Sequence, residues 1–470
     1  MKVYGFLAAA LGVFGFSSAA GAFDTGHHSD LTRAALSEFR MSEDAIQTAQ
    51  LENWLVDYYT NQPGTGLGDD LEKLHFDNLT TTNRVRNYWG RLTVNTKKAV
   101  EAAAREGNST RVVALIGMSL HAVQDFYTHS NWVETHPGFS GAYSTRTWFD
   151  FPVPDTSTSL FTGEYPNHYP IRKTDHGTYT NLKSMNHDSY IRPRWDDAYV
   201  YAYSASVQWV SGIEKWVSAV DPSVWSKARD LSLSTKNQNA LQTDLRAAYR
   251  VSEWVSDSKN DGHWKGNGSG SATAFGSFTA SWAVGIDSIF VEHFKNQKWH
   301  KALTENLMVD LPPETPVPAM PSKPLYKKAI RVRTTLVEEL PVGFFESKID
   351  VGGSPDFFAR VTIDGVPFIE AMQIDKSSIT PSWWSIKFVD IGASDVAIRY
   401  ELFDEDSSDE VCDINPASGK QTLDFSLSSG GRVSGDISGS AGKRITSEGA
   451  TPDGSRARVK LVIDSRDLMQ

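Results

Sequence analysis

Residues 120–132 read LHAVQDFYTHSNW, and within them His121, Asp125 and His129 are spaced four residues apart. At about 100° per residue, helix positions i, i+4 and i+8 share one face, so these three side chains form a stripe. The preceding residues 111–119, RVVALIGMS, are apolar on most sides, which predicts a helix deep in a large fold. Unpaired charge is costly there, so the stripe requires partners.

Two interpretations explain how the polar groups of this stripe could be satisfied. One is a buried hydrogen-bond chain of histidine, aspartate and histidine. The other is metal binding by neutral imidazoles and a carboxylate, a donor set that suits zinc. Eight residues of helix rise about 12 Å, so His121 and His129 would not share one ion whose ligand bonds are about 2 Å long. The metal interpretation therefore predicts two or more ions, with Asp125 between them.

The amino terminus, MKVYGFLAAALGVFGFSSAAGAFD, contains Lys2, an apolar run and the small residues AGA at 20–22. The run is too short to span a bilayer comfortably, and the AGA pattern is typical of a secretory cleavage site. We therefore predict a signal peptide at residues 1–22 and a mature chain that begins at Phe23. The protein would be secreted or periplasmic.

Composition limits the possible functions. The 470 residues carry a formal net charge of −11, which argues against nucleic-acid binding. One cysteine, Cys412, excludes an intramolecular disulfide, so the stability of an exported chain must come from core size and from metals. The length predicts two or more domains, and we expect a monomer.

Hydrophobic periodicity divides the chain into two parts. Residues 23–310 follow a helical pattern, as in DDAYVYAYSASVQWVSGIEKWV at 196–217. Residues 311–326 contain six prolines, which no helix or central strand accommodates, and predict a linker. Residues 327–470 alternate between apolar and polar, as in VAIRYELFD at 396–404, with turn residues between the segments. We predict a multidomain protein with an all-α, metal-binding catalytic domain followed by an all-β sandwich domain.

Further candidate ligands are scattered through the helical part. They occur in FDTGHH (Phe23 and His28), NWLVDYY (Asp57), KLHFDN (His75 and Asp77), TDHGTY (His176) and MNHDSY (His187 and Asp188). The first motif is the most informative. Signal cleavage before Phe23 would free an α-amino group that can chelate a metal together with its own carbonyl, which explains why a ligand cluster would begin at the mature terminus.

Together these motifs resemble the zinc-dependent phospholipase C and single-strand nuclease superfamily, an all-helical fold with three zinc ions. There the mature N-terminal residue binds zinc, a histidine follows, and a helix bears H-x-x-x-D with another histidine downstream. Phe23, His28, His121, Asp125 and His129 match that order. FDTGHHSDLT, LHAVQDFYTHSNW and MNHDSYIRP are most similar to the branch of bacterial phosphatidylcholine-preferring phospholipases C and heterokaryon-incompatibility proteins. The resemblance covers roughly residues 23–250.

The same resemblance extends to the second set of motifs. It implies that Asp57 and His75 bind metal and that Asp57 also serves as general base, with Asp77 as the rival for Asp57. This chain has phenylalanine where the family's terminal residue is usually tryptophan, and its third histidine follows the aspartate by four residues instead of six. The family's last histidine–carboxylate pair has no clean match. The candidates for it are His176, His187 and Asp188, and the alternative is Asp196 and Asp197 in WDDAY.

The β part contains two aspartate-rich segments. KIDVGGSPDFFARVTIDG carries Asp350 and Asp356, and YELFDEDSSDEVCDINP carries Asp404, Asp406, Asp409 and Asp413. Such loops are either solvated turns or, because Ca²⁺ prefers six to eight oxygen ligands, a calcium site. Together they resemble the calcium-dependent phospholipid-binding sandwich of protein kinase C, which shares the D-x5-D and D-x-D spacings. Cys412 stands where an aspartate is expected in that family.

These features predict a secreted, zinc-dependent phospholipase C that hydrolyses phosphatidylcholine at a membrane surface, with two or three zinc ions and calcium in the sandwich. Phe126, Tyr127 and Trp132 lie beside the expected site and either hold choline on their aromatic faces or pack in the core. The alternatives are an exported zinc-dependent nuclease and a non-catalytic, toxin-like lipid-binding protein with structural metals. Structural and catalytic zinc use the same residue types, so the sequence leaves all three open.

Overall fold

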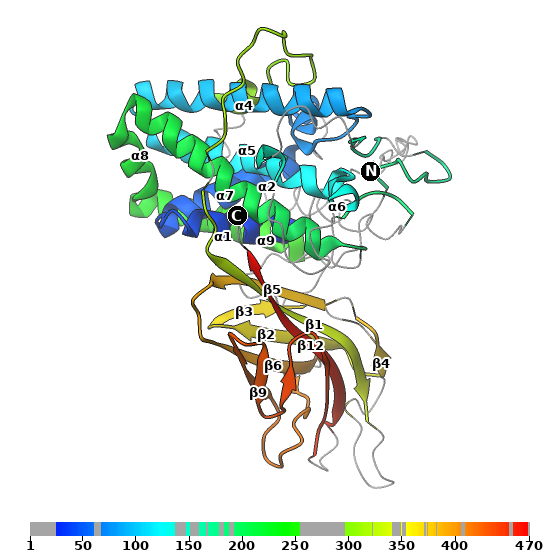
Figure 1. Cartoon of the computed structure of the whole chain (residues 1–470). Helices are drawn as coiled ribbons and strands as arrows, with labels where there is room; N and C mark the ends of the chain where they lie inside the picture. Colours follow the sequence, from blue (N-terminus) through cyan, green and yellow to red (C-terminus); the bar gives the residue numbers. More distant parts are fainter. Residues whose placement is uncertain are drawn as a thin grey trace, which may run out of the picture.

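The computed structural model places a helical region above an antiparallel β-sandwich region (Figure 1). This arrangement confirms the predicted fold class. The structure describes residues 25–60, 67–136, 147–150, 159–165, 168–177, 183–187, 192–253, 297–321, 323–340, 349, 354–370, 373, 375–381, 383–405, 409–450 and 455–468. Among them, no helix is both long enough and apolar enough to cross a membrane.

The helical region surrounds one buried helix, α5 (Ser109–His129). Its N-terminus is capped by the Asn108 side chain, whose Oδ1 accepts the Arg111 amide at 2.9 Å. Every residue from Val112 to His129 is buried, so this helix has no solvent-facing side along its last five turns. It packs against four helices, α1 (Thr25–Ser37), α2 (Glu43–Thr60), α4 (Thr82–Arg105) and α7 (Trp195–Val220), and against one side of the shorter α8 (Pro222–Arg229).

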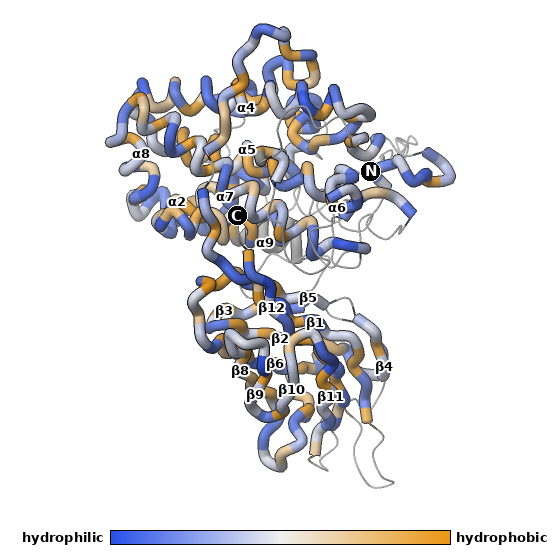
Figure 2. Tube along the Cα trace, in the orientation of Figure 1, coloured by the Kyte–Doolittle hydropathy of each residue, from blue (hydrophilic) through white to orange (hydrophobic). Residues whose placement is uncertain are grey.

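The remaining helical elements are shorter or lie outside this centre. They are α3 (Gly68–Leu71), η1 (Glu72–His75), α6 (Trp132–Thr135), η2 (Trp148–Asp150), α8 (Pro222–Arg229), α9 (Thr235–Glu253) and α11 (His300–Thr304). Hydrophobic and hydrophilic residues alternate along α4, as expected for a helix with one face on the core (Figure 2).

The β region consists of two antiparallel sheets. One has the order β11-β12-β1-β4, with β5 also paired to β1, and the other has the order β10-β9-β8-β6-β2-β3, with β7 paired to β6. Alternate residues of β8 and β12 are buried, which is the period-two pattern of strands with one face on a core. The strands are β1 (Lys327–Glu339), β2 (Phe357–Ile363), β3 (Val366–Ile369), β4 (Ser378–Ile379), β5 (Trp383–Asp390), β6 (Asp395–Glu405), β7 (Asp409–Val411), β8 (Leu423–Ser428), β9 (Arg432–Gly435), β10 (Gly439–Ser440), β11 (Arg444–Glu448) and β12 (Ala457–Leu468).

The proline-rich stretch packs on the helical region. A Cβ on Gly90 of α4 would lie 3.1 Å from Leu311 and 3.2 Å from Val317, and one on Gly212 of α7 would lie 2.6 Å from Met320. The described residues of 311–326 therefore form a strap across α4 and α7. Sequence periodicity does not reveal this docking, because a proline-rich segment has no regular buried face.

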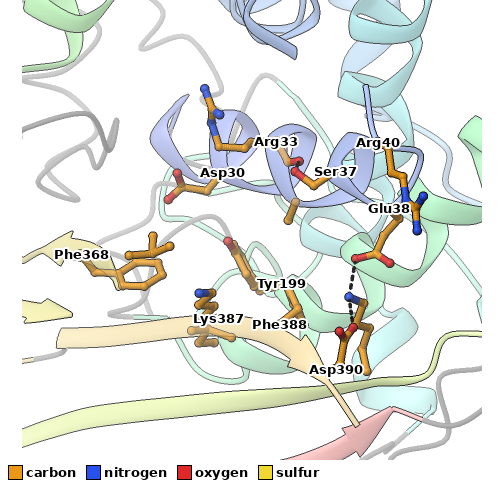
Figure 3. A pocket seen from close by; sticks show the side chains of 14 residues that line it. Asp30, Arg33, Ser37, Glu38, Arg40, Tyr199, Phe368, Lys387, Phe388 and Asp390 are labelled. Carbon is orange, nitrogen blue, oxygen red and sulfur yellow. Dashed lines mark hydrogen bonds and ion pairs between the residues drawn. The ribbon is translucent and has the colours of Figure 1, made fainter. Parts of the chain in front are cut away.

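The two regions meet at a contact that contains charged residues. Arg331 of β1 donates to Asp196 at the start of α7 and, in bidentate fashion, to Asp464 of β12, with distances of 2.6–2.8 Å. The rings of Tyr203 and Phe388 stack with their centroids 3.7 Å apart. A cavity of about 530 Å³ lies beside this contact, between α1 and strands β3 and β5 (Figure 3).

Candidate metal centre

Five segments bring histidines and aspartates to the centre of the helical region. His28 lies in the first turn of α1, Asp57 near the end of α2, and His75 at the end of η1. Phe76 has a positive φ of 58° and is fully buried, so the chain turns there and places Asp77 beyond His75. The other ligand candidates come from α5 and from the loop that contains His176.

The donor atoms form three groups in which the candidate ligand atoms all lie within 4.8 Å of one another. In each group the three residues are buried. The groups are His28 with Asp57 and His121, His75 with His121 and Asp125, and Asp77 with His129 and His176. The first two share His121, so they form one double site, and the third is built around the last turn of α5.

The double site is held together by short contacts between imidazoles and carboxylates. Nε2 of His28 lies 3.0 Å from Asp125 Oδ1, and Nε2 of His121 lies 3.2 Å from Asp125 Oδ2. Nε2 of His75 lies 3.1 Å from Asp57 Oδ1. Asp125 therefore lies between His28 and His121, and His129 at the other end of the stripe belongs to a separate group.

Outer contacts fix the orientation of these rings. His28 Nδ1 lies 2.6 Å from Gln124 Oε1, His121 Nδ1 lies 3.0 Å from Asn53 Oδ1, and His75 Nδ1 lies 3.2 Å from the Leu71 carbonyl oxygen. These oxygens only accept hydrogen bonds, so each Nδ1 carries the proton. In a neutral ring the lone pair of Nε2 then points into the site, as in metal-binding histidines.

The third group shows the same arrangement without a carboxylate between the rings. His129 Nδ1 donates to the His75 carbonyl at 2.6 Å, and His176 Nδ1 donates to the Gly177 carbonyl at 2.8 Å. Their two Nε2 atoms face each other at 3.1 Å, and an Asp77 oxygen lies 3.3 Å from His129 Nδ1. Two facing lone pairs repel unless a proton or a cation lies between them.

The electrostatics of the double site favour a cation. Burial opposes ionisation of Asp125, but the imidazoles of His121 and His28 lower its pKa well below the usual range. Burial also disfavours the charged form of His75, yet its hydrogen bond to Asp57 raises its pKa to about 9. The carboxylates that stabilise a proton on His75 would equally stabilise a metal ion beside them.

The residues fit zinc or a similar transition metal. His121 Nε2 and both oxygens of Asp125 are buried, and none of the three has hydrogen-bond geometry with a described residue. Neutral imidazoles and carboxylates are the donors that zinc takes in hydrolytic sites, where the ligand bonds are about 2.0–2.2 Å. A carboxylate as deeply buried as that of Asp125 requires positive charge beside it, which either a protonated imidazole or a metal ion would supply.

Other predicted ligands lie elsewhere. His187 Nδ1 donates to the Pro193 carbonyl and its Nε2 contacts Glu134 at 3.0 Å, so it belongs to none of the three groups. Asp196 pairs with Arg331, and Asp197 pairs with Arg194. Phe23 and Asp188 lie outside the described residues.

The ligand set predicted from the sequence did not include Asp77. The motifs suggested Asp77 only as an alternative to Asp57. The structure places both residues close to other candidate ligands, in different groups. The signal was present in KLHFDN, where His75 and Asp77 flank a buried phenylalanine. The aromatic residues Phe126, Tyr127 and Trp132 are at most 1% exposed and pack among other rings of the core, which favours the packing interpretation over choline binding.

The structure brings together two of the aspartates of the predicted calcium site, Asp356 and Asp404. The Asp356 amide donates to Asp404 Oδ1 at 2.6 Å, so the ends of β2 and β6 are adjacent, and the Asp375 amide donates to Asp356 Oδ1 at 2.5 Å. Asp413 is buried and accepts the Asn415 amide at 3.0 Å, which makes it part of a turn. Asp350 and Asp406 lie outside the described residues, as does the side chain of Asp409.

Comparison with protein families gives one match, to the VWA7 N-terminal domain, over residues 31–145. The matched stretch contains α2, α4 and α5 and therefore most of the candidate ligands. It is a different family model from the superfamily that the motifs resemble. No curated protein matches the chain.

Several solved structures show a distant similarity to the chain. They include human GIVD cytosolic phospholipase A2 (11% identity, 31% of this chain and 18% of that chain, TM-score 0.21) and the paired C2 domains of extended-synaptotagmin 2 (14% identity, 33% and 47%, TM-score 0.20). The alpha toxin from Clostridium absonum matches with 12% identity over 92% of this chain and 98% of that chain, with a TM-score of 0.16. The chain spans about a fifth of the phospholipase A2 that it matches. TM-scores of this size do not indicate a function.

Proposed function

We propose that the chain is an exported, metal-dependent phosphodiester hydrolase that acts as a phospholipase C, releasing phosphocholine and diacylglycerol from phosphatidylcholine. The observation that carries the proposal is the convergence of three buried histidine–aspartate groups on one helix. In the double site, nitrogen and carboxylate oxygen atoms face each other at 3.0–3.2 Å. The resemblance of the motifs to zinc-dependent phospholipases C supports the choice of a phospholipid substrate.

Each residue has a distinct part in this chemistry. Bound divalent cations would activate water at neutral pH and neutralise charge on the phosphate. Asp57 is 6% exposed, with Oδ1 3.1 Å from His75 Nε2 and 3.6 Å from His121 Nε2. Burial opposes its ionisation, but His121 and His75 lower its pKa, so it stays in the form that accepts a proton. Asn53 and Gln124 hold the rings of His121 and His28.

Metal analysis combined with two substrates, phosphatidylcholine liposomes and single-stranded DNA, tests the proposal. We expect two or three zinc ions per mature chain and release of phosphocholine from phosphatidylcholine liposomes, both lost after treatment with a chelator. Cleavage of single-stranded DNA without phosphocholine release would identify a nuclease. Bound metal with neither activity would identify a lipid-binding protein with structural metals, and a metal-free protein would favour the buried hydrogen-bond chain.

We further propose that Asp356 and Asp404, with Asp350 and Asp406, bind calcium and attach the sandwich to lipid phosphate. The contact between Asp356 and Asp404 supports this assignment. Replacing both by alanine should weaken calcium-dependent binding to liposomes and hydrolysis of bilayers, and should spare hydrolysis of a soluble short-chain phosphatidylcholine.

The matched control is Asp364→Asn, which changes a half-exposed aspartate at the opposite end of β2 that pairs with Lys387. Asparagine tolerates the positive φ of 46° at that position. Equal loss on soluble and bilayer substrates in the double variant would show that the two aspartates support the catalytic fold directly.

A further inference from the structure

Tyr169 is the most exposed large hydrophobic residue among those that the structure describes. Its relative exposure is 101%, compared with 70% for Tyr326. Single exposed hydrophobic residues are ordinary on protein surfaces, so exposure alone assigns no role. The loop that carries Tyr169, residues 168–175, provides three further observations.

First, the loop is held in one conformation. The Asp175 side chain is fully buried and accepts the His168 amide at 3.0 Å, the Arg172 amide at 2.7 Å and the His168 ring at 2.6 Å. At the base, the Glu164 amide donates to the Thr174 carbonyl and the His176 amide donates to the Glu164 carbonyl, both at 3.0 Å. An aromatic side chain on a rigid loop loses little further entropy when it is buried by a partner.

Second, the loop is directly connected to the third metal-binding group. His176 follows Asp175 in the chain, and its Nε2 lies 3.1 Å from His129 Nε2. The neighbouring segment is also fixed to the end of α5, since the Gly163 amide donates to the His129 carbonyl at 2.9 Å. The loop is thus attached to the C-terminal end of α5, at His129. Helix α6 follows that end of α5 in the chain (Figure 1).

Third, the loop is basic in an acidic protein. The chain has a net charge of −11, yet residues 168–174, HYPIRKT, contain two cations and no acid. Arg172 and Lys173 are exposed, whereas the Asp175 carboxylate that follows them is buried and occupied by its hydrogen bonds. An exposed tyrosine beside two cations matches the polar surface of a bilayer, where aromatic rings lie at the depth of the headgroups and cations meet phosphates.

We propose that the 168–175 loop docks on a phospholipid bilayer, with the Tyr169 ring among the headgroups and with Arg172 and Lys173 on lipid phosphates. Docking would bring the bilayer against the same loop that is followed directly by His176. The inference rests on the proposed phospholipase function and deepens it, because it identifies the surface that meets the substrate. The proposed docking of this loop is independent of the candidate calcium site, whose residues Asp356 and Asp404 lie at the ends of β2 and β6 in the sandwich.

Two variants of the full-length mature protein test this surface. Tyr169→Ala should reduce turnover on phosphatidylcholine vesicles, and binding to them in sedimentation, by roughly tenfold, as expected for losing a buried aromatic ring. Arg172→Gln combined with Lys173→Gln should weaken binding to vesicles that contain phosphatidylglycerol by about fivefold per cation, with the difference abolished by high salt. Both variants should hydrolyse monomeric short-chain phosphatidylcholine at the wild-type rate and keep their metal.

The matched control is Tyr326→Ala, which removes another exposed tyrosine, next to the start of β1, and should change neither binding nor turnover. Wild-type vesicle binding by Tyr169→Ala, or an equal effect of Tyr326→Ala, would overturn the inference. Equal loss on vesicles and on soluble substrate, with loss of metal, would also overturn it, because the loop would then only support His176. If no variant or wild-type protein hydrolyses either substrate but the sedimentation differences persist, the phospholipase assignment fails and the docking surface stands.

Discussion

Asp125 is the residue with the largest expected effect on function. It contacts His28 and His121 with separate oxygen atoms and is fully buried. Asparagine preserves its shape, removes its charge and places an NH₂ group against a ring nitrogen. We expect Asp125→Asn to lose metal from the double site. Changes to residues that only hydrogen-bond to metal ligands lower activity by up to roughly a hundredfold, and we expect Asp125→Asn to lower phosphodiester hydrolysis by more than that.

The control for this variant is Asp230→Asn, at an exposed aspartate that follows α8 and pairs with its neighbour Arg229. That change should leave activity and metal content as in the wild type. Near-normal hydrolysis by a folded Asp125→Asn protein would remove the double site from the mechanism and would favour a buried hydrogen-bond chain.

Gly163 controls the position of His176. A Cβ on Gly163 would lie 2.7 Å from the Cα and 2.9 Å from the backbone nitrogen of His176, and backbone atoms cannot rotate away. We expect Gly163→Ala to displace His176 and to release one metal ion per chain, with the ions of the double site retained. Metal analysis of the purified variant measures this. Gly392→Ala is the control, because its added Cβ would meet nothing within 4 Å; unchanged stoichiometry in Gly163→Ala would contradict the assignment of the third group.

Some of the candidate ligands could be predicted from the sequence, and others could not. His121 and Asp125 are one helical turn apart, so their spacing alone places them on one face. His129 shares that face, but its partner His176 comes from a loop 47 residues later. No periodicity links two such positions, because the contact depends on how the loop closes at Glu164 and Asp175. The resemblance supplied His176 only as one of several candidates.

At the scale of elements, the close approach of α2 and α5 sets the geometry of the double site. Gly117 of α5 faces Ala49 of α2, and a Cβ there would lie 2.3 Å from the Ala49 carbonyl oxygen. Alanine normally stabilises a helix relative to glycine. Here we expect Gly117→Ala to force the helices apart and to lower the free energy of unfolding by about 1–3 kcal/mol, together with weaker metal binding.

Denaturant unfolding with and without metal measures this effect. Gly212→Ala in α7 is the comparison, because its Cβ would meet the flexible end of Met320, which can move aside. We expect that variant to remain close to the wild type in stability. A Gly117→Ala protein as stable as wild type would show that α2 and α5 can separate without cost.

The elements themselves were largely predictable. The change from helical to alternating periodicity near residue 327 coincides with the start of β1. The docking of the proline-rich strap was not predictable, since its contacts with α4 and α7 depend on the shape of those helices. The same holds for the ends of the sandwich strands, where Asp375 joins Asp356 through a backbone hydrogen bond that no sequence spacing indicates.

Arg331 connects the helical region to the β region. Its side chain is 10% exposed, and those of its partners Asp196 and Asp464 are 17% and 12% exposed. Removing the guanidinium would leave two largely buried carboxylates without a cation. We expect Arg331→Met to lower the free energy of unfolding by about 3 kcal/mol, measured by urea denaturation. Arg399→Met, at a half-exposed pair with Asp424, should cost at most about 1 kcal/mol; equal effects would show that the contact between the regions contributes no more than a surface ion pair.

The three candidate metal-binding groups would also affect resistance to proteolysis. The chain has no disulfide, yet its ligands come from segments far apart in sequence, with His28 and Gln124 in contact across 96 residues. Ions in the double site would cross-link α1, α2 and α5, and an ion in the third group would cross-link α5 and the 168–177 loop. Such ions would stabilise only the folded chain. We therefore expect the metal-loaded protein to resist limited proteolysis. Chelation alone, with no change in the sequence, should convert that molecule into one that is digested quickly.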